Sequence, residues 1–401
     1  MNELAALIMA AVGLGYWSVQ LVTLVRVTRR VPLLQQLPAG ERENWPRVSA
    51  ILTARNEEAA LEAAVRAHLE GDYPNLELII VEDRSSDGTP DIARRLAAAD
   101  SRVKVVHITE LPEGWLGKLN ALQRGLQAAT GEWLLLSDGD VAVQRGVLRR
   151  IIGYCERRRL DHCAVLPRCL PVQPLLDCLT SLFMRLVVLN FRIWAIEDPR
   201  SKASVGVGAF NMVRRAALER TPGFAWLKME VADDLCLGQM LKAAGARQSI
   251  VNGCAMTGLQ FHSSLGDSLR SAERATYTAI GNFSMLRLIA LSALVLLLEL
   301  SPLMVLVLAR TPWSQALGLG LLAMALAAMA VSNRWLDRRS WNLVFWPLAE
   351  LVMCYSQLRA GVLGAWRGGI IWRGTFYPNA GLKAGRRFGQ AWAHKDMRSS
   401  S

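Results

Sequence analysis

Charged residues are scarce in this chain, making up 20% of its 401 residues, whereas hydrophobic residues make up 52%. Soluble domains average about 25% charged residues, so this balance argues for membrane segments. Cysteine pairs are lacking too: the seven cysteines are odd in number, scattered, and without Cys-x-x-Cys spacing. A disulfide framework and a structural zinc site are therefore not expected. The composition also excludes collagen-like, disordered and coiled-coil classes.

Acidic residues are fewer than basic ones, 34 against 46, which leaves a net charge of +12. A basic surplus is compatible with nucleic-acid binding, but it is equally expected of a protein on the inner leaflet of a membrane. The basic residues concentrate beside apolar runs, and no known nucleic-acid reading motif is present. We therefore expect the lipid bilayer as a partner and no nucleic acid.

The first apolar run, Leu4–Val25, has 22 residues without a charge. At ~1.5 Å per residue it can cross a ~30 Å hydrocarbon layer, which predicts a transmembrane anchor over 1–30. A cleaved signal peptide is the alternative. Because Arg26, Arg29 and Arg30 follow the run, the positive-inside rule places the next block in the cytoplasm. The expected location is the inner (plasma) membrane, with several spans.

Two later runs, Ile289–Ala309 and Trp313–Ser332, predict a helical hairpin in the membrane. A third, Leu343–Gly364, is interrupted by one acid and one arginine, so it is either a re-entrant or interfacial helix or a further span. We expect membrane helices over 286–365 and a basic cytoplasmic tail over 366–401.

Residues Leu175–Ile196 carry a polar stripe of Asp177, Ser181, Arg185 and Arg192 at helical spacing. The stripe predicts an in-plane helix at the lipid surface, and a buried helix with a polar edge is the alternative.

The block between the anchor and the later runs, 46–285, alternates short β-rich runs with helical stretches, which predicts an α/β domain with a mostly parallel sheet. The expected strands are Val48–Leu52, Leu76–Val81, Val103–Ile108 and Trp133–Leu136. The expected helices are Glu57–Leu69, Pro90–Ala99, Lys118–Ala129 and Val147–Arg157.

Polar residues follow three of these strands, and ligands bind such sheets at the carboxyl ends of the strands. The fourth strand ends in Asp138-Gly139-Asp140. Two carboxylates so spaced suit Mg²⁺ or Mn²⁺, which is typically held by one or two carboxylates together with substrate phosphates. A solvated turn, in which both aspartates bind local backbone donors, is the alternative.

In chain order, the motifs Ala54-Arg55-Asn56-Glu57-Glu58, Glu82-Asp83, Asp138-x-Asp140 and Asp233-Asp234 resemble those of the family-two inverting glycosyltransferases with the GT-A fold. The stretch Glu-Gly-Trp-Leu-Gly-Lys at 113–118 is similar to that of membrane-bound, lipid-glycosylating members, including the hopanoid-associated and ceramide glucosyltransferase groups. The resemblance implies a Rossmann-like nucleotide-sugar domain with membrane helices at both ends of the chain.

The resemblance also implies roles for individual residues. Asp138 and Asp140 would hold Mg²⁺ or Mn²⁺ and so neutralise the leaving diphosphate. Asp83 would contact the nucleoside, and Lys118 a phosphate, with a solvated lysine as the alternative. Trp115 would pack against a sugar or anchor its loop. The implied donor-binding residues are Ala54, Arg55, Glu57, Asp83, Lys118 and Asp138.

Transfer with inversion needs a general base, and Asp234 matches the second acid of the family's pair, while Asp233 stands where a glutamate is commoner. The alternative is a helix N-cap followed by a first-turn acid. The chain lacks the Gln-x-x-Arg-Trp motif that processive members and several lipid-glycosylating members carry beyond the base. Arg270 and Arg274, one turn apart, could approach the diphosphate or the acceptor, or lie on a basic interfacial helix. His262 is either a metal ligand or structural.

We therefore expect a membrane-anchored, metal-dependent enzyme that transfers a hexose from a UDP-linked nucleotide sugar onto a membrane lipid at the cytoplasmic face. The alternatives are a processive polysaccharide synthase and a membrane protein that binds nucleotide sugars without transferring them.

Overall fold

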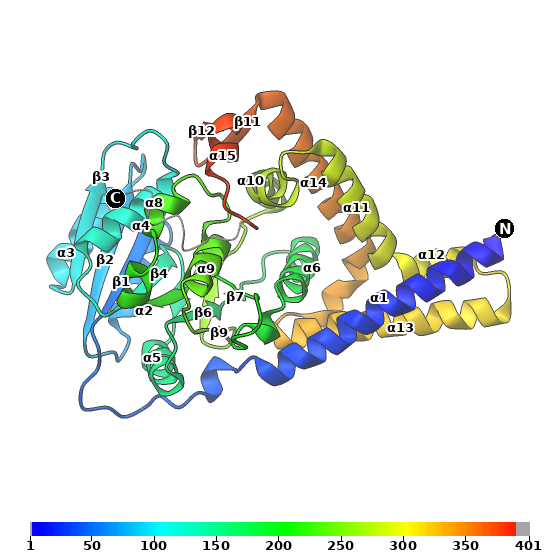
Figure 1. Ribbon diagram of the computed structural model, residues 1–401, viewed down its shortest axis with the longest axis horizontal. Coiled ribbons are helices and arrows are strands. Elements are labelled where there is room, and N and C mark those ends of the chain that lie inside the picture. The colour runs from blue at the N-terminus through cyan, green and yellow to red at the C-terminus, as the bar shows by residue number, and fades with distance from the viewer. Residues whose placement is uncertain (1, 390–401) are drawn as a thin grey trace. The chain divides into compact units, whose positions relative to one another are not determined.

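The structure is a computed structural model that describes residues 2–389 (Figure 1). The chain forms two compact units, each assembled from separated segments. We call the first the sheet unit; it holds Val31–Leu170, Ala195–Gln260 and the described residues from Ala380. The second, the helical unit, holds the described residues up to Arg30 together with Pro171–Trp194 and Phe261–Asn379.

The sheet unit is built on seven strands in the order β3-β2-β1-β4-β8-β6-β9. The strand β8 is antiparallel to both of its neighbours, and the other pairs are parallel, which confirms the mostly parallel sheet. The strands are β1 (Val48–Ala54), β2 (Leu76–Asp83), β3 (Val103–Ile108), β4 (Trp133–Asp138), β6 (His162–Leu166), β8 (Asn211–Arg214) and β9 (Gln248–Asn252). A smaller sheet joins β5 (Ala142–Val143), β10 (Thr257–Leu259) and β7 (Arg168–Cys169).

Every residue of β1 and β2 is buried, as expected for parallel strands covered on both faces. The helices are α2 (Leu61–Leu69), α3 (Thr89–Ala99), α4 (Gly117–Ala128), α5 (Val147–Arg158), α7 (Arg215–Glu219), α8 (Gly223–Leu227) and α9 (Asp233–Ala243). A Cβ on Gly125 of α4 would lie 2.3 Å from Ile51 Cγ2 and 3.0 Å from Val81 Cγ2. A glycine there therefore lets α4 lie directly on β1 and β2.

Strand register aligns the polar strand ends that the sequence singled out. Thr53 of β1 is opposite Asp138 of β4, and Ala54 is opposite Glu82 of β2. Asp83 and Asp138 therefore reach the same edge of the sheet from either side of β1. All four predicted strands and four predicted helices are confirmed, with α2 beginning at Leu61 rather than at residue 57.

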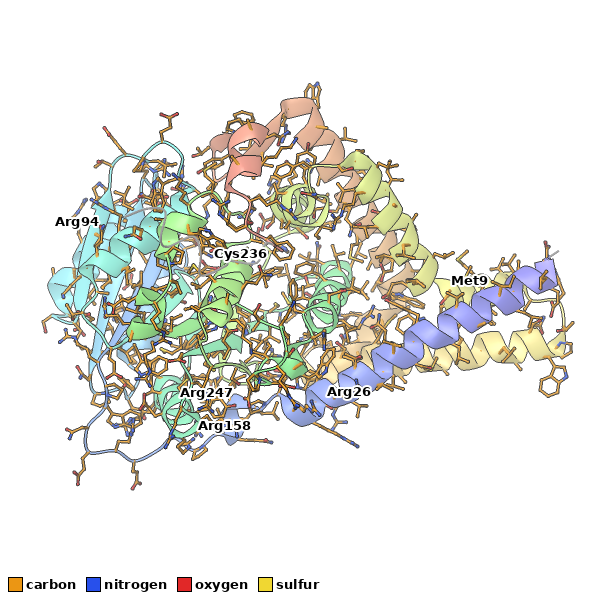
Figure 2. The ribbon with its side chains drawn as sticks, viewed as in Figure 1. Met9, Arg26, Arg94, Arg158, Cys236 and Arg247 are labelled. Atoms are coloured by element: carbon orange, nitrogen blue, oxygen red, sulfur yellow. The ribbon has the colours of Figure 1, made fainter. Side chains whose placement is uncertain are left out.

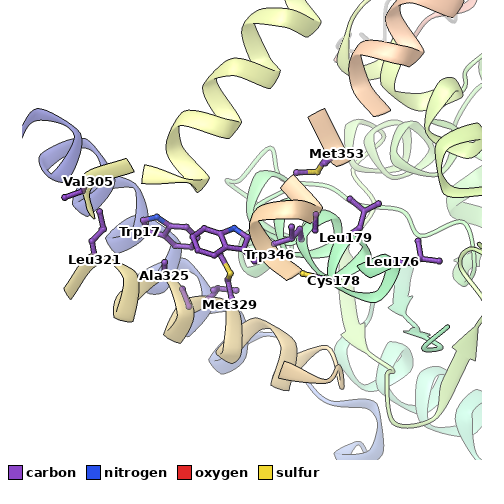
Figure 3. Packing of buried hydrophobic residues seen from close by; sticks show 14 of the residues in the cluster. Trp17, Leu176, Cys178, Leu179, Val305, Leu321, Ala325, Met329, Trp346 and Met353 are labelled. Carbon is purple, nitrogen blue, oxygen red and sulfur yellow. The ribbon is translucent and has the colours of Figure 1, made fainter. Parts of the chain in front are cut away.

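The helical unit contains α1 (Asn2–Arg30), α6 (Pro174–Asn190), α10 (Leu265–Ala275), α11 (Met285–Glu299), α12 (Ser301–Leu308), α13 (Pro312–Trp335) and α14 (Trp346–Arg367). A hairpin of β11 (Gly369–Trp372) and β12 (Thr375–Pro378) follows, and α15 (Asn379–Gly385) leads into the sheet unit. In its core, the rings of Trp17 on α1 and Trp346 on α14 meet edge to face at 6.3 Å, and Met329 of α13 belongs to the same cluster (Figure 3).

Within residues 2–389, three helical segments are long and apolar enough to cross a membrane: Asn2–Arg30, Pro174–Ala195 and Pro312–Trp335. A fourth span exists if Leu265–Ile280 and Met285–Glu299, which meet at 104°, are taken as one broken span. The arginines at the end of α1, among them Arg26, are exposed (Figure 2). The first and third of these segments coincide with predicted spans.

The prediction of one continuous helix over Ile289–Ala309 is wrong, because the helix ends at Glu299 and a new one starts at Ser301. Pro302 lies in the first turn of α12, where its missing N–H is tolerated; within a continuous helix it would remove a hydrogen bond. The run at 343–364 forms α14, which is not among the candidate spans.

The polar stripe of α6 is not at a surface. Asp177, Ser181 and Arg185 are all buried. Arg185 pairs with Glu299 of α11, with an Nη2–Oε2 distance of 2.6 Å, and Arg338 lies 3.8 Å from Asp177. Three of the four predicted stripe residues thus form a buried polar edge, while Arg192, just after α6, is exposed. The orientation of this helix relative to a membrane stays a prediction. All seven cysteines are free, and Cys236 of α9 is fully buried (Figure 2).

Candidate active site

Lys118 lies at the centre of the candidate site, in the first turn of α4. Its Nζ is 2.9 Å from Asp138 Oδ1 at the end of β4 and 3.7 Å from Asp233 Oδ2 at the start of α9. Three residues predicted separately from the sequence, on three elements, thus meet at the carboxyl edge of the sheet. Lys118 is not the solvated surface lysine of the alternative reading, since only 20% of its side chain is exposed.

Asp234 is fixed by main-chain donors. The amide of Gly208 donates to its Oδ2 at 2.9 Å, and the amide of Leu235 donates to its Oδ1 at 2.8 Å. A Cβ on Gly208 would lie 3.0 Å from Lys118 Nζ and 3.7 Å from Asp138 Oδ2. Gly208 therefore borders the same charged group, and its lack of a side chain leaves the carboxylates accessible. A small cavity is lined here by Lys118, Leu119, Leu122, Leu136, Ser137, Gly208, Asn211, Phe224, Asp233, Asp234 and Leu237.

The electrostatics of this group are those of several carboxylates sharing one cation. Burial raises the pKa of Asp233 to about 7; Lys118 opposes this shift, and the charges of Asp234 and Asp138 add to it. Burial also raises the pKa of Asp234, against the opposing effects of Lys118 and of the two amides. Burial lowers the pKa of Lys118, but the surrounding carboxylates outweigh it and leave that pKa above its ordinary value. Excess negative charge of this kind favours a further cation.

The predicted metal ligands, Asp138 and Asp140, both remain partly exposed at the end of β4. Gly139 between them donates to Thr53 O at 3.1 Å, so the turn lies against β1. Within residues 2–389, no group of three or more His, Cys, Asp or Glu side chains is arranged to hold a metal. The pair still suits Mg²⁺ or Mn²⁺, because such ions need only one or two carboxylates when substrate phosphates supply further oxygens.

Near the start of α4, Asp83 is only 4% exposed and is flanked by two arginines. Arg84 binds it in a two-pronged pair, Nε to Oδ1 at 2.7 Å and Nη2 to Oδ2 at 3.1 Å. Arg55 Nη1 lies 3.9 Å from Asp83 Oδ2. A Cβ on Gly117 would be 2.7 Å from that same oxygen, so Gly117 lets the start of α4 approach Asp83. The predicted donor residues Arg55, Asp83 and Lys118 are thus brought together.

The remaining predicted residues are less closely grouped. Ala54 ends β1, and a Cβ on Gly139 would lie 3.4 Å from its Cβ. Glu57 uses its amide to bond Thr89 Oγ1 at 2.9 Å, which joins the turn after β1 to the start of α3. Trp115 is partly exposed in the loop before α4.

Arg270 and Arg274 belong to α10 of the helical unit rather than to the sheet unit. Arg270 is exposed, while Arg274 donates to Ser271 Oγ at 2.7 Å and lies over the ring of Trp372 at 4.9 Å. His262, in the same unit, lies beside Phe261 and 3.8 Å from Asp267. It takes part in no metal-binding group among the described residues.

Two residues of the site, Arg84 and Gly208, were not predicted from the sequence. Arg84 follows Asp83 directly and has a positive φ of 54°, which is uncommon for a residue other than glycine, but a sequence does not display that. Gly208 contacts Asp234, which is 26 positions away in the chain, so no local pattern marked it.

Among solved structures, the mannosyltransferase from Pyrobaculum calidifontis in complex with GDP-Man and Mn²⁺ is similar in fold, with a TM-score of 0.51. The match covers 89% of this chain and 99% of that one at 20% sequence identity, so it shows a shared fold alone. The expected glycosyltransferase fold is thereby confirmed.

Two curated relatives are similar over part of the sequence. A beta-monoglucosyldiacylglycerol synthase from Trichormus variabilis is 28% identical over 198 residues, which are 48% of this chain and 40% of the relative. A GalNAc(5)-diNAcBac-PP-undecaprenol beta-1,3-glucosyltransferase from Campylobacter jejuni is 30% identical over 107 residues, 27% of this chain and 34% of the relative. The match thus spans less than half the length of either relative.

The family model described as Glycosyl transferase family 21 matches residues 5–381, which include the helices of the helical unit as well as Lys118, Asp138 and the acid pair at 233–234. With the match extending over nearly the whole sequence, the chain belongs to glycosyl transferase family 21.

Proposed function

We propose that this protein transfers a hexose from a nucleotide sugar, UDP-linked, with inversion, onto the hydroxyl of a membrane lipid. The observation that carries the proposal is the group at the carboxyl edge of the sheet, where Lys118 lies between Asp138 and Asp233, with Asp234 fixed beside them. A lipid acceptor is supported by the names of the relatives, a glucosyldiacylglycerol synthase and an undecaprenol-linked glucosyltransferase. The apolar helices support membrane attachment.

Donor binding is assigned to the side of the group formed by Arg55, Asp83 and Lys118. Asp83 contacts the nucleoside, and the positive charge of Lys118 attracts the diphosphate. Asp138 and Asp140 would hold Mg²⁺ or Mn²⁺, which supplies Lewis-acid neutralisation of the diphosphate as it leaves. Ala54 and Glu57 shape the donor pocket at the end of β1. Trp115, in the loop just before Lys118, packs against a sugar.

Asp234 is the proposed general base. Hydrogen bonds from two main-chain amides fix its carboxylate, and each carboxylate oxygen keeps a lone pair that can take the proton of the acceptor hydroxyl. As the acceptor oxygen forms its bond to the anomeric carbon, its proton passes to Asp234 while the bond to the diphosphate breaks. Asp233 lies closer to Lys118, so we assign it to positioning and charge balance.

Attachment to the inner membrane by several spans, with the sheet unit in the cytoplasm, is part of the proposal. The candidate spans and the exposed arginines at the end of α1 support it. Arg270 and Arg274 remain candidates for an acceptor or diphosphate contact, although Arg274 already binds Ser271 and Trp372.

The deciding experiment incubates membranes containing the protein with radiolabelled UDP-glucose, UDP-galactose, UDP-N-acetylglucosamine or GDP-mannose, and then extracts the lipids. Label in a lipid supports the proposal and identifies the sugar. Label in a high-molecular-weight polymer supports a processive synthase instead. Donor binding without any transfer supports a non-catalytic binding protein. Asp140→Ala should weaken donor binding and turnover together. Full activity in excess EDTA would refute the requirement for a metal ion.

A further inference from the structure

We propose that residues 385–389, here called the strap, hold the acid pair in its working position, and that Glu230 is the positioning residue that joins the two. The proposal rests on the transferase function proposed above. It concerns a part of the sheet unit to which neither the sequence motifs nor the family match assigns a role.

Glu230 is buried, with 3% of its surface exposed, and its two carboxylate oxygens face different segments. Oε2 accepts from the amide of Arg387 and from the amide of Phe388, the latter at 2.8 Å. Oε1 accepts from the amide of Ala232 at 2.9 Å. Ala232 directly precedes Asp233, so one carboxylate connects the strap to the residue next to the acid pair. Such hydrogen bonds to a charged acceptor are roughly twice as strong as neutral ones.

The strap also lies on the segment 226–230 through side-chain contacts. The guanidinium of Arg387 stacks over the ring of Trp226 at 5.4 Å, and its Nε donates to Trp226 O at 3.2 Å. A Cβ on Gly385 would come within 2.2 Å of Met229 Cβ, so Gly385 permits a close approach that another residue would prevent. The amide of Gly389 reaches Gln239 Oε1 on α9 at 3.4 Å.

The same segment is tied to the other side of the site. The carbonyl of Lys228 accepts from the amide of Leu116 at 2.7 Å, two residues before Lys118. The segment 226–230 therefore joins the loop that carries Lys118 to the start of α9, which carries Asp233 and Asp234. A displaced strap is expected to shift the lysine and the two acids relative to each other.

That shift should affect turnover more than donor affinity. A misplacement of about 1 Å in a catalytic group can lower a rate on the order of 100-fold, because attack requires narrow geometry. Arg55 and Asp83, which are proposed to hold the nucleoside part of the donor, have no contact with the strap among the bonds described above. Lys118 attracts the diphosphate through its charge, and a shift of about 1 Å changes such an attraction little. Loss of the strap should therefore lower kcat and leave the KM for the donor largely unchanged.

The first experiment measures kcat and the donor KM of the full-length protein with Glu230→Gln and Arg387→Ala. Glutamine keeps the shape of the side chain but can accept on one side only, so it cannot serve both Ala232 and the strap. Matched controls are Glu219→Gln and Arg124→Ala, which change exposed residues of the same unit. We expect kcat of both strap variants to fall on the order of 10- to 100-fold, with KM within about twofold and both controls unchanged.

A double variant tests whether the two residues act together. If both act through the strap, Glu230→Gln with Arg387→Ala should be no slower than the slower single variant. Fully multiplicative losses would mean independent effects and would overturn the proposal, as would wild-type kcat in both single variants. Glu230→Asp, whose shorter carboxylate still offers two oxygens, should recover part of the lost rate if the bridge is what matters.

A readout that does not depend on transfer separates this proposal from the proposed function. In hydrogen exchange of the folded wild-type protein, the amides of Ala232, Arg387 and Phe388 should be protected, and Arg387→Ala should speed exchange at Ala232. If the wild type transfers no sugar but this coupling is present, the transferase proposal fails while the connection by the strap stands. An unchanged rate of hydrogen exchange at the Ala232 amide in Arg387→Ala would overturn the proposed role of the strap, even if the enzyme is active.

Discussion

Asp233 and Asp234 are adjacent in the chain but lie in different surroundings. Asp233 faces Lys118, whereas Asp234 is held by two amides. If Asp234 is the base, Asp234→Asn should lower turnover by about 10²–10⁴-fold and leave donor affinity nearly unchanged. Asparagine keeps the shape and one accepting oxygen but loses the basic carboxylate. Donor titration and initial rates on the same preparation provide the measurement.

Asp233→Asn serves as the matched control for that substitution. Its effect on turnover should be milder, since we assign Asp233 to charge balance around Lys118. A normal rate in Asp234→Asn with folding intact would move the base to Asp233. Unfolding of the Asp234→Asn variant would instead favour a helix-capping role for this residue.

His68 on α2 is a buried residue that the chemistry does not use. It is 1% exposed, and neither ring nitrogen has a hydrogen-bond partner among the described residues. Burial lowers its pKa from 6.5 to about 4. The unfolded chain therefore binds a proton at a higher pH than the folded protein, and stability falls as the pH drops below about 6.5.

Between pH 7 and pH 5, this histidine should cost about 2 kcal/mol of the free energy of unfolding. His68→Leu removes the titrating group and the two unsatisfied nitrogens, so it should flatten the pH dependence and raise the melting temperature at pH 5. Thermal denaturation of the purified protein at both pH values measures this. An equally steep loss of stability in the variant would assign the effect to other groups, such as His162, whose pKa burial also lowers to about 4.

At the scale of elements, the alternating apolar runs were sufficient to predict β1 to β4 and the helices that follow them, because a buried parallel strand is almost entirely apolar. The single helix expected over Ile289–Ala309 is instead divided at Leu300, because hydropathy does not register what Pro302 does to a helix. The stripe on α6 was predictable from its spacing, but its partners were not, since they lie on α11 and beyond α13, far away in the chain.

Arg185 ties α6 to two other helices of the helical unit. It pairs with Glu299 at 2.6 Å and donates to Gln20 of α1 at 2.7 Å, with 1% of its side chain exposed. Arg185→Met leaves Glu299 buried without its cation, which should cost about 3–5 kcal/mol. The double change Arg185→Met with Glu299→Gln should cost much less. Thermal unfolding in detergent compares the two, with Arg192→Met, an exposed arginine just after α6, as the control.

At the scale of the whole molecule, the motifs that are spread along the sequence meet at one edge of the folded sheet. Lys118, Asp138 and Asp233 could be predicted as members of one site because each follows a strand or starts a helix at the same sheet edge. The strap could not be predicted from the sequence. Its connection to Glu230 joins residues 157 positions apart, and the donors are main-chain amides, which no side-chain pattern marks. The two units could not be predicted from the sequence either, because each is assembled from segments that alternate along the chain.

Membrane topology gives the last prediction. In the helical unit, Glu3 at the start of α1 accepts from Thr311 Oγ1 at 2.7 Å. The turn between α12 and α13 therefore lies at the opposite end of α1 from the arginines of its last turns. If those arginines are cytoplasmic, this turn faces outward. A cysteine at Trp313, which is 83% exposed, should then react with an impermeant thiol reagent in intact cells, whereas one at Glu41 should react only after lysis.

The background for this experiment is Cys354→Ser, because the other six cysteines are buried and Cys354 alone is partly exposed. Both reporter positions carry exposed side chains, so a difference in labelling reports the side of the membrane rather than burial. Labelling of the Glu41 reporter in intact cells would place the sheet unit outside, away from the cytoplasmic pool of nucleotide sugars, and would contradict the proposed donor. Labelling of neither reporter before lysis would mean that the α12–α13 turn does not reach the outer face, and α1 would then lie in the membrane without crossing it.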